Sequence, residues 1–367
     1  MSIFTILILF LLLAGICGFI LVRFGVRRIV LNRSFPEKAV FCGDTSEMVE
    51  TVENSHPVII PWLRVESRMP PGIQFGHQEN LDISGELYHR SMFTIMPYQR
   101  IVRTHKILLT RRGVYQVGHA AMTCGDLTGW FIKTVELDLP GMEITVYPRI
   151  LDSSSIPRPV LWQLGEWTRE RTLLQDPFMI YGIRPYLPGD SIRDIHWKAT
   201  ARCQSLQVRV HEWNALPSVM LLINSQTRED QWGELMDYEQ ETVEHVISLA
   251  ATMCLQAFRE GAKIGFSSNM CMLNGDERIS AYVSPMGPDR KDALLDAFAR
   301  LKVVRTVRFA TFLDQLLLPE HCAVVLLSLY AGAELPAFQQ RMRQQGHTVI
   351  QWICGKTPPV HPDREQV

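Results

Sequence analysis

The sequence predicts a protein of combined α/β and all-β class: an N-terminal transmembrane helix, a β-sandwich-like domain, and then a doubly wound α/β domain. Three observations lead to this prediction. Residues 3–22 are almost uninterruptedly apolar. Residues 47–148 contain short β-rich runs separated by turn residues, without a helical period. From residue 206 onward, apolar runs typical of buried parallel strands alternate with helical patterns.

Residues 1–23 are predicted to form a transmembrane anchor. No charged side chain occurs in residues 1–22, and about 20 apolar residues suffice to cross a bilayer. A cleaved signal peptide is the competing interpretation, but a basic start and a small-residue cleavage site are not evident. The first basic residues follow the span: Arg23, Arg27, Arg28 and Arg33. Residues 24–46 are therefore predicted to be a basic juxtamembrane linker, and the remainder is expected on the cytoplasmic side.

The composition limits the function classes. A chain of 367 residues can hold two domains with separate cores. The formal net charge is −1, so no basic excess indicates nucleic-acid binding. The eight cysteines are scattered without a CxxC pair, which favours a reducing compartment over a disulfide framework.

The middle of the chain is divided by its turn residues. Residues 47–150 are predicted to be the β-rich, sandwich-like domain. Residues 151–180 are predicted to be a linker followed by a helix over residues 160–175, because a Ser- and Pro-rich segment precedes a helical apolar pattern.

Residues 181–355 are predicted to be the α/β domain, followed by a flexible tail at 356–367. Helices are expected at 238–260, 289–301 and 335–345, the first and third ended by Gly261 and Gly346. Strands are expected at 206–210, 218–223, 262–267, 322–328 and 347–354.

The most distinctive stretch covers residues 182–202. Pro188 and Gly189 suit a type II turn, and Asp190 stands where an N-cap belongs. If residues 191–202 are helical, Ile192 and His196 share one face. The cationic side chains of this stretch indicate either a docking site for a partner or an internal salt-bridge cluster that braces two domains.

These residues carry a resemblance. The motif residues are Gly182, Arg184, Tyr186, Pro188, Gly189, Asp190, Arg193, Ile195, His196, Trp197, Lys198, Ala201 and Arg202. This pattern resembles the signature of the bacterial family called domain of unknown function 58. The segments 112–118 and 125–131 also resemble parts of that family. The resemblance implies a von Willebrand factor A-like C-terminal domain, a place at the bacterial inner membrane, and an AAA+ ATPase of the MoxR type as partner.

An A-like domain would place a metal site in the loop after the strand at 218–223. The residues there are Asn224, Ser225, Gln226 and Thr227. Magnesium needs at least one carboxylate, and Asn224 supplies an amide where the family of A domains has Asp. We therefore expect a degenerate site without metal, and no other cofactor.

The expected function is that of a non-enzymatic, membrane-anchored adaptor whose A-like domain binds a protein partner. Two alternatives remain open. One is a metal-dependent ligand-binding A domain that uses the Asn224 loop. The other is an enzyme that uses Asp190 or His196 as a base.

Overall fold

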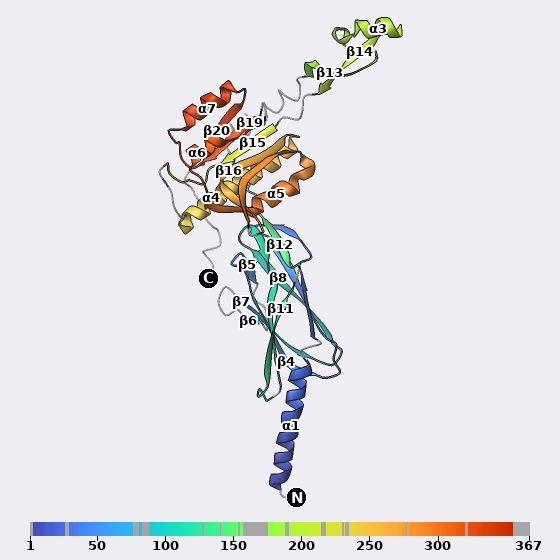
Figure 1. Cartoon of the computed structure of the whole chain (residues 1–367), viewed down its shortest axis with the longest axis vertical. Coiled ribbons are helices and arrows are strands. Elements are labelled where there is room, and N and C mark those ends of the chain that lie inside the picture. The colour runs from blue at the N-terminus through green and yellow to red at the C-terminus, as the bar shows by residue number, and fades with distance from the viewer. Residues whose placement is uncertain are drawn as a thin grey trace. The chain divides into compact units, whose positions relative to one another are not determined.

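The chain divides into two compact units in the computed structural model, Met1–Arg149 (unit 1) and Ile150–Val367 (unit 2). Figure 1 labels their elements. The structure describes residues 3–25, 29–75, 81–82, 88–126, 128–139, 141–152, 155–156, 175–187, 191–213, 218–229, 231, 235–275, 277–319 and 322–354.

The expected fold class is wrong as stated, because the described chain consists mostly of β-strands in several sheets. The predicted transmembrane span is corrected as well. A helix, α1 (Ile3–Gly25), is present, but within the described ranges no helix is long and apolar enough to cross a membrane. Phe19 of α1 packs edge-to-face on Phe131, with ring centroids 5.8 Å apart. A Cβ atom at Gly18 would lie 3.0 Å from the Asp126 carboxylate, so the helix lies close to Asp126 there.

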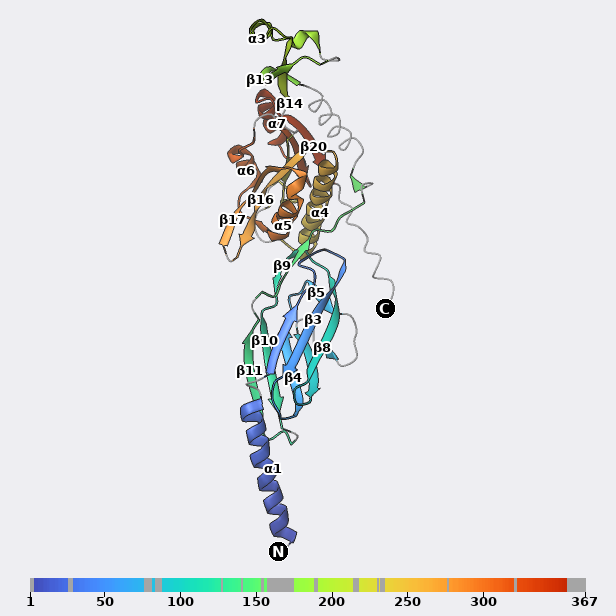
Figure 2. The same ribbon diagram turned by 90° about the vertical axis from the view of Figure 1, so that its right-hand side faces the viewer.

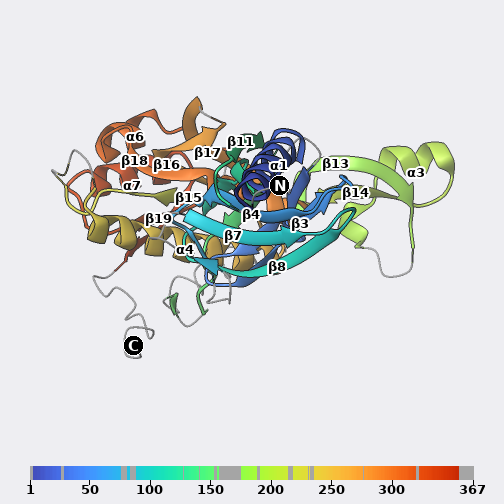
Figure 3. The same cartoon turned by 90° about the horizontal axis from the view of Figure 1, so that it is seen from below.

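Within its described residues, unit 1 contains three sheets. Figure 3 shows some of their strands from below. The first has the order β1 (Ile29–Ser34), β3 (Thr45–Asn54), β8 (Arg100–Leu109), β5 (Ile73–Phe75). The second has the order β11 (Ile132–Asp138), β10 (His119–Gly125), β4 (Ile60–Arg68), β7 (Tyr88–Ile95), β6 (Leu81–Asp82). The third has the order β2 (Ala39–Phe41), β12 (Glu143–Tyr147), β9 (Gly113–Gln116). All pairs are antiparallel except β2 with β12.

The predicted basic linker at residues 24–46 is also wrong, because β1 and β2 belong to the sheets of unit 1. β1 pairs with β3 along its whole length. Its side chains alternate between buried and exposed, as expected for a strand with one face in a core. Arg33 points inward and is only 4% exposed, although its position in the sequence suggested a charge beside a membrane span.

The apolar interior of unit 1 is divided into two clusters. The first includes Leu31, Val52, Val65 and Phe93. The second includes Met48, Met69, Ile107 and Leu109. Between them, five strands each bury a polar residue; these residues form what we call the polar layer: Arg33, Glu50, Ser67, His89 and His105. The layer interrupts the apolar alternation, for example at Glu50 of β3, which lies between Met48 and Val52 in the sequence.

The polar layer connects the first sheet to the second. Arg33 donates from Nε and Nη2 to Glu50 Oε1 at 2.8 and 2.6 Å, and from Nη1 to Ser67 Oγ. Glu50 Oε2 lies 3.4 Å from His105 Nε2. The His89 ring packs edge-to-face on His105, with centroids 4.8 Å apart. Among the described residues, neither ring nitrogen of His89 has a hydrogen-bond partner.

Unit 2 is built on a mixed six-stranded sheet, which corrects the expected doubly wound parallel sheet. Its main order is β17 (Glu277–Met286), β16 (Lys263–Asn274), β15 (Ser218–Ile223), β19 (Ala323–Ser328), β20 (Thr348–Ile353), and β18 (Leu301–Arg305) also pairs with β16. β16, β15, β19 and β20 are parallel to their neighbours in that order. β17 and β18 pair with β16 antiparallel.

Helices cover both faces of this sheet (Figure 2). α4 (Asp237–Arg259) and α5 (Lys291–Arg300) share an apolar cluster with Leu221 and Ile223 of β15. α6 (Phe309–Gln315) and α7 (Leu335–Gln344) pack against Met220 and Leu222. Successive residues of β15 therefore face opposite layers, which explains why this strand is apolar throughout. α4 ends before Gly261, whose φ of 79° is easily adopted by glycine.

Several sequence predictions lie outside the described residues. These are most of the linker and helix at 151–180, the tail at 356–367, and the turn formed by Pro188, Gly189 and Asp190.

Candidate functional site

The described motif residues lie on a β-ribbon with short helices between its strands, which we call the arm. It consists of β13 (Gln175–Pro185), the 3-10 helix η3 (Ile192–Asp194), α3 (Trp197–Cys203) and β14 (Gln207–Trp213) (Figure 1). β13 and β14 are antiparallel partners, with Ile183 opposite Arg209. Tyr186 continues the ribbon, because its backbone N donates to Leu206 O at 2.8 Å.

The continuous helix at 191–202 that would place Ile192 and His196 on one face does not form, because a β-bridge interrupts it. Ile195 pairs with Val208 of β14 and is buried. The next residue, His196, caps α3: its Nδ1 accepts from the backbone N of Ala199 at 3.0 Å. His196 also donates from its own backbone N to Gln207 O at 2.8 Å. The histidine of the motif therefore has a structural role in joining α3 to the ribbon.

Four motif side chains extend into solvent from the arm. Trp197 is 65% exposed, and the cationic residues Arg193, Lys198 and Arg202 are exposed as well. Arg184 and Tyr186 are half-buried. Ile192, next to Arg193, is 73% exposed. The arm thus exposes a tryptophan and an isoleucine among cationic side chains. An internal salt-bridge cluster that braces two domains would be expected to bury these apolar side chains.

The second candidate site is the loop after β15, called here the Asn224 loop (residues 224–231). Asn224, Ser225 and Gln226 are all buried. Asn224 Nδ2 donates to Ser328 Oγ at 3.1 Å, at the end of β19. Ser225 donates from its backbone N and from Oγ to Asn269 Oδ1, both at 2.9 Å, on β16. The loop is therefore tied to β19 at its carboxyl end, and to β16 just beyond the residues that pair with β15.

Gln226 ties the same loop to two further segments. Its Oε1 accepts from the backbone N of Phe309 at 2.6 Å, at the start of α6. Its Nε2 donates to Glu229 O at 3.2 Å and Gln231 O at 3.0 Å. All hydrogen-bonding atoms of the Gln226 amide group are thus used for holding the loop together.

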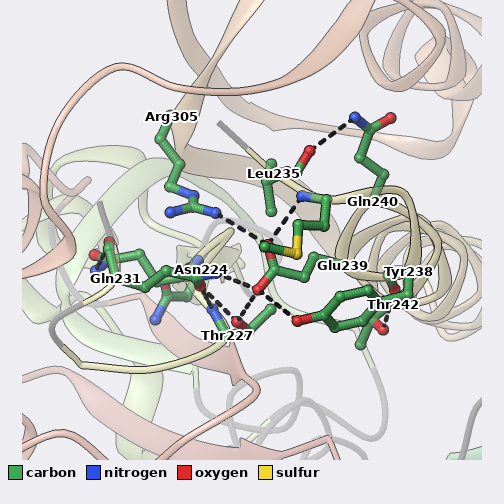
Figure 4. Close-up of polar contacts among 11 residues, drawn as sticks. Asn224, Thr227, Gln231, Leu235, Tyr238, Glu239, Gln240, Thr242 and Arg305 are labelled. Atoms are coloured by element: carbon green, nitrogen blue, oxygen red, sulfur yellow. Dashed lines mark hydrogen bonds and ion pairs between the residues drawn. The ribbon is translucent and has the colours of Figure 1, made fainter. Parts of the chain in front are cut away.

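Glu239, in the first turn of α4, is the carboxylate of this site (Figure 4). Its Oε2 accepts from the backbone N of Met236 at 3.1 Å, which satisfies one free N–H group of the helix start. Its Oε1 accepts from Thr227 Oγ1 at 3.3 Å and from Gln231 Nε2. Burial raises the pKa of Glu239, but these hydrogen bonds and the charge of Arg305 outweigh burial and lower it. Glu239 therefore remains an anion.

Arg305, the last residue of β18, lies beside Glu239. Its Nη2 is 3.9 Å from Glu239 Oε2, and its side chain is 2% exposed. None of its three guanidinium nitrogens has a hydrogen-bond partner within the described part of the chain. Burial lowers the pKa of Arg305, and the charge of Glu239 partly opposes that effect.

The Asn224 loop does not fit a divalent metal ion. Magnesium prefers carboxylate and water oxygens in an octahedral arrangement. Here Asn224 Oδ1 instead accepts from the backbone N of Gln226 at 2.9 Å. Thr227 and Gln231 bond to one another and to Glu239, and a guanidinium lies beside the carboxylate. Within the described residues, no group of three His, Cys, Asp or Glu could hold a metal ion.

Replacing Gln226 by leucine is expected to destabilise unit 2 by about 1–3 kcal/mol, because the buried backbone N of Phe309 loses its acceptor. Denaturant unfolding of the full chain measures this change. Arg228→Leu is the matched control, since Arg228 is exposed in the same loop. Equal stability of Gln226→Leu and the wild type would show that the Gln226 amide does not hold the loop.

Comparison with known proteins assigns part of the chain to a family. The family model described as "Protein of unknown function DUF58" matches residues 182–280, which include the described motif residues of the arm and the Asn224 loop. This match confirms the resemblance to the DUF58 family for residues 182–280. No curated protein matches the chain.

Solved structures resemble part of the chain only distantly. The CARDB domain of the PF1109 protein from Pyrococcus furiosus has 18% identity and a TM-score of 0.21, with 32% of this chain and 91% of that chain covered. Native alpha-2-macroglobulin from Escherichia coli has 11% identity and a TM-score of 0.27, covering 33% and 24%. A non-cellulosomal cohesin from Archaeoglobus fulgidus has 11% identity and a TM-score of 0.21, covering 34% and 92%. The expected von Willebrand factor A-like assignment finds no support in these comparisons.

The residues that complete the Asn224 site were not predicted from the sequence. They are Gln231, Glu239, Asn269, Arg305 and Ser328. One signal was available for Glu239, because a Glu in the first turn of a strongly patterned helix often bonds back to the helix start. The others come from distant strands, so their spacing along the chain carries no signal.

Proposed function

We propose that this protein is a non-enzymatic adaptor whose arm binds a protein partner. The observation that carries the proposal is the solvent exposure of motif residues on the arm, above all Trp197 beside the cations Arg193, Lys198 and Arg202. Trp and Arg dominate the binding energy of protein interfaces. An exposed tryptophan that contributes little to a core is best explained by a partner that covers it.

The chemistry of the arm specifies an acidic partner surface with an apolar pocket. The charges would steer the encounter, and Trp197 and Ile192 would supply buried apolar area. An AAA+ ATPase of the MoxR type, the partner implied by the family resemblance, is the proposed occupant. The scattered cysteines support a reducing compartment, so the proposed place of action is the cytoplasmic side of the bacterial inner membrane.

Affinity capture of the full-length protein in the presence of ATP tests the adaptor function. We expect an AAA+ ATPase among the captured proteins, and a drop in its recovery of about tenfold or more for Trp197→Ala and Arg193→Ala. Arg278→Ala is the matched control, because Arg278 is an exposed arginine on β17, outside the arm. Capture of no ATPase by a folded wild type, or equal recovery by all variants, would refute the proposal.

A further inference from the structure

Arg305 has binding capacity that the described residues do not use. Its guanidinium group carries five N–H donors, and none of them has an acceptor among the residues that the structure describes. The side chain is 2% exposed, so bulk solvent does not serve these donors freely. Buried polar groups in native proteins are almost always hydrogen-bonded. The Arg305 guanidinium is therefore expected to have an acceptor that is not among the described residues.

The backbone around Arg305 is fixed against the sheet. Thr306, the next residue, donates from its backbone N and from Oγ1 to Asn269 O, both at 3.0 Å. Arg305 itself pairs with Met270 of β16. The guanidinium is thereby held near the carboxyl ends of β15 and β16. Ligands of open α/β sheets bind at this edge, where the strand order reverses.

Glu239 does not serve as the missing acceptor. Its closest approach to Arg305 is 3.9 Å, beyond hydrogen-bonding distance. Both its oxygens already accept from Met236, Thr227 and Gln231. Thr227 and Gln231, which bond to Glu239 from the Asn224 loop, carry a neutral hydroxyl and a neutral amide. The unused donors of the site are therefore cationic, and they require an anionic acceptor.

We propose that Arg305 binds a small oxyanion at the carboxyl edge of the unit 2 sheet. The planar fork of Nε and the two Nη atoms matches two oxygens of a carboxylate or a phosphate group. This site is separate from the partner-binding role proposed for the arm. Its failure would leave the adaptor proposal intact, and the converse also holds.

Melting of the full-length protein in matched salts tests the oxyanion site. Sodium phosphate, sodium sulfate and sodium acetate are compared with sodium chloride at equal ionic strength and pH. We expect at least one kind of oxyanion to raise the melting temperature by about 2–5 °C over chloride: either phosphate and sulfate together, or acetate. A response to acetate alone would assign the ligand group as a carboxylate, and a response to phosphate and sulfate would assign a tetrahedral oxyanion.

Two arginine variants make the test specific. Arg305→Gln is expected to abolish the rise, whereas Arg308→Gln, the removal of an exposed arginine three residues away, is expected to retain it. If Arg305→Gln does not fold, Arg305→Lys keeps the charge but not the fork, and is expected to reduce the rise. A wild type without any rise, or an undiminished rise in the Arg305 variants, would overturn the proposal.

Discussion

Replacement of Glu50 by leucine is expected to lower the free energy of unfolding of unit 1 by about 3–5 kcal/mol, since it leaves the buried Arg33 guanidinium without its carboxylate. Arg33 makes two hydrogen bonds to Glu50 Oε1, and both side chains are fully buried. The remaining partner of Arg33, Ser67, is neutral and cannot compensate the charge. Hydrogen–deuterium exchange of peptides from β3 and β8 reports the stability of unit 1 separately from unit 2.

The double variant Arg33→Met/Glu50→Leu separates the loss of a charge partner from the loss of packing. Replacing both members of a buried ion pair by apolar residues of similar size is often nearly neutral. We therefore expect the double variant to recover most of the stability that Glu50→Leu loses. A double variant as unstable as Glu50→Leu would show that the damage comes from packing and not from the unpaired charge.

Unit 1 is also expected to lose on the order of 4 kcal/mol of stability as the pH falls from about 6.5 to about 3. Burial, and then the charge of Arg33, lower the pKa of His89 to about 3 from its usual value of 6.5. The unfolded chain therefore takes up this proton at a higher pH than the folded chain, and acid favours unfolding throughout the interval between the two values.

Glu50 adds to the acid sensitivity at lower pH. Burial raises its pKa, but the hydrogen bond with His105 and the charge of Arg33 outweigh that effect and lower it to about 2 from 4.5. The stability that Glu50 contributes is present above about pH 4.5 and declines as the pH falls toward 2. Between pH 6.5 and 4.5 the loss should therefore come mainly from His89.

Two histidine variants check the assignment of the acid effect. His89→Phe is expected to flatten the dependence of stability on pH between 6.5 and 4.5, because phenylalanine cannot titrate beside Phe75. His119→Phe, at a histidine exposed on β10, is expected to keep it. Hydrogen exchange at several pH values, corrected for intrinsic rates, measures both. An unchanged slope in His89→Phe would contradict the assignment.

The sequence predicted those elements whose apolar pattern is local. The helix expected at 238–260 is α4 (Asp237–Arg259), because the spacing of Val243, Val246 and Ala250 repeats within a few residues. β15 matches its predicted bounds because the strand is apolar on both faces. β17 was missed, because its residues are mostly polar or exposed and its pairing with β16 compensates for a weak pattern.

The candidate site was predictable only in part, because only its local sequence pattern could be recognised. The position of the Asn224 loop followed from the end of the apolar strand β15. The residues that bond to that loop lie up to 104 positions away in the sequence, so no local pattern predicts them. Arg33 shows the same limit in unit 1. Its neighbours in the sequence suggested that Arg33 lies beside a membrane span. In the structure Arg33 instead pairs with Glu50, 17 residues later.

The polar layer has a consequence for how the strands of unit 1 align. A strand can slip by two residues along its neighbour without exchanging its faces, so a purely hydrocarbon interior discriminates weakly between such alignments. In unit 1, a slip of β1 by two residues would move Arg33 away from Glu50 and place its charge opposite Val52 or Met48. Ser67 and His89 impose the same condition on β4 and β7. The layer therefore stabilises the observed register of strands in both sheets against alignments shifted by two residues.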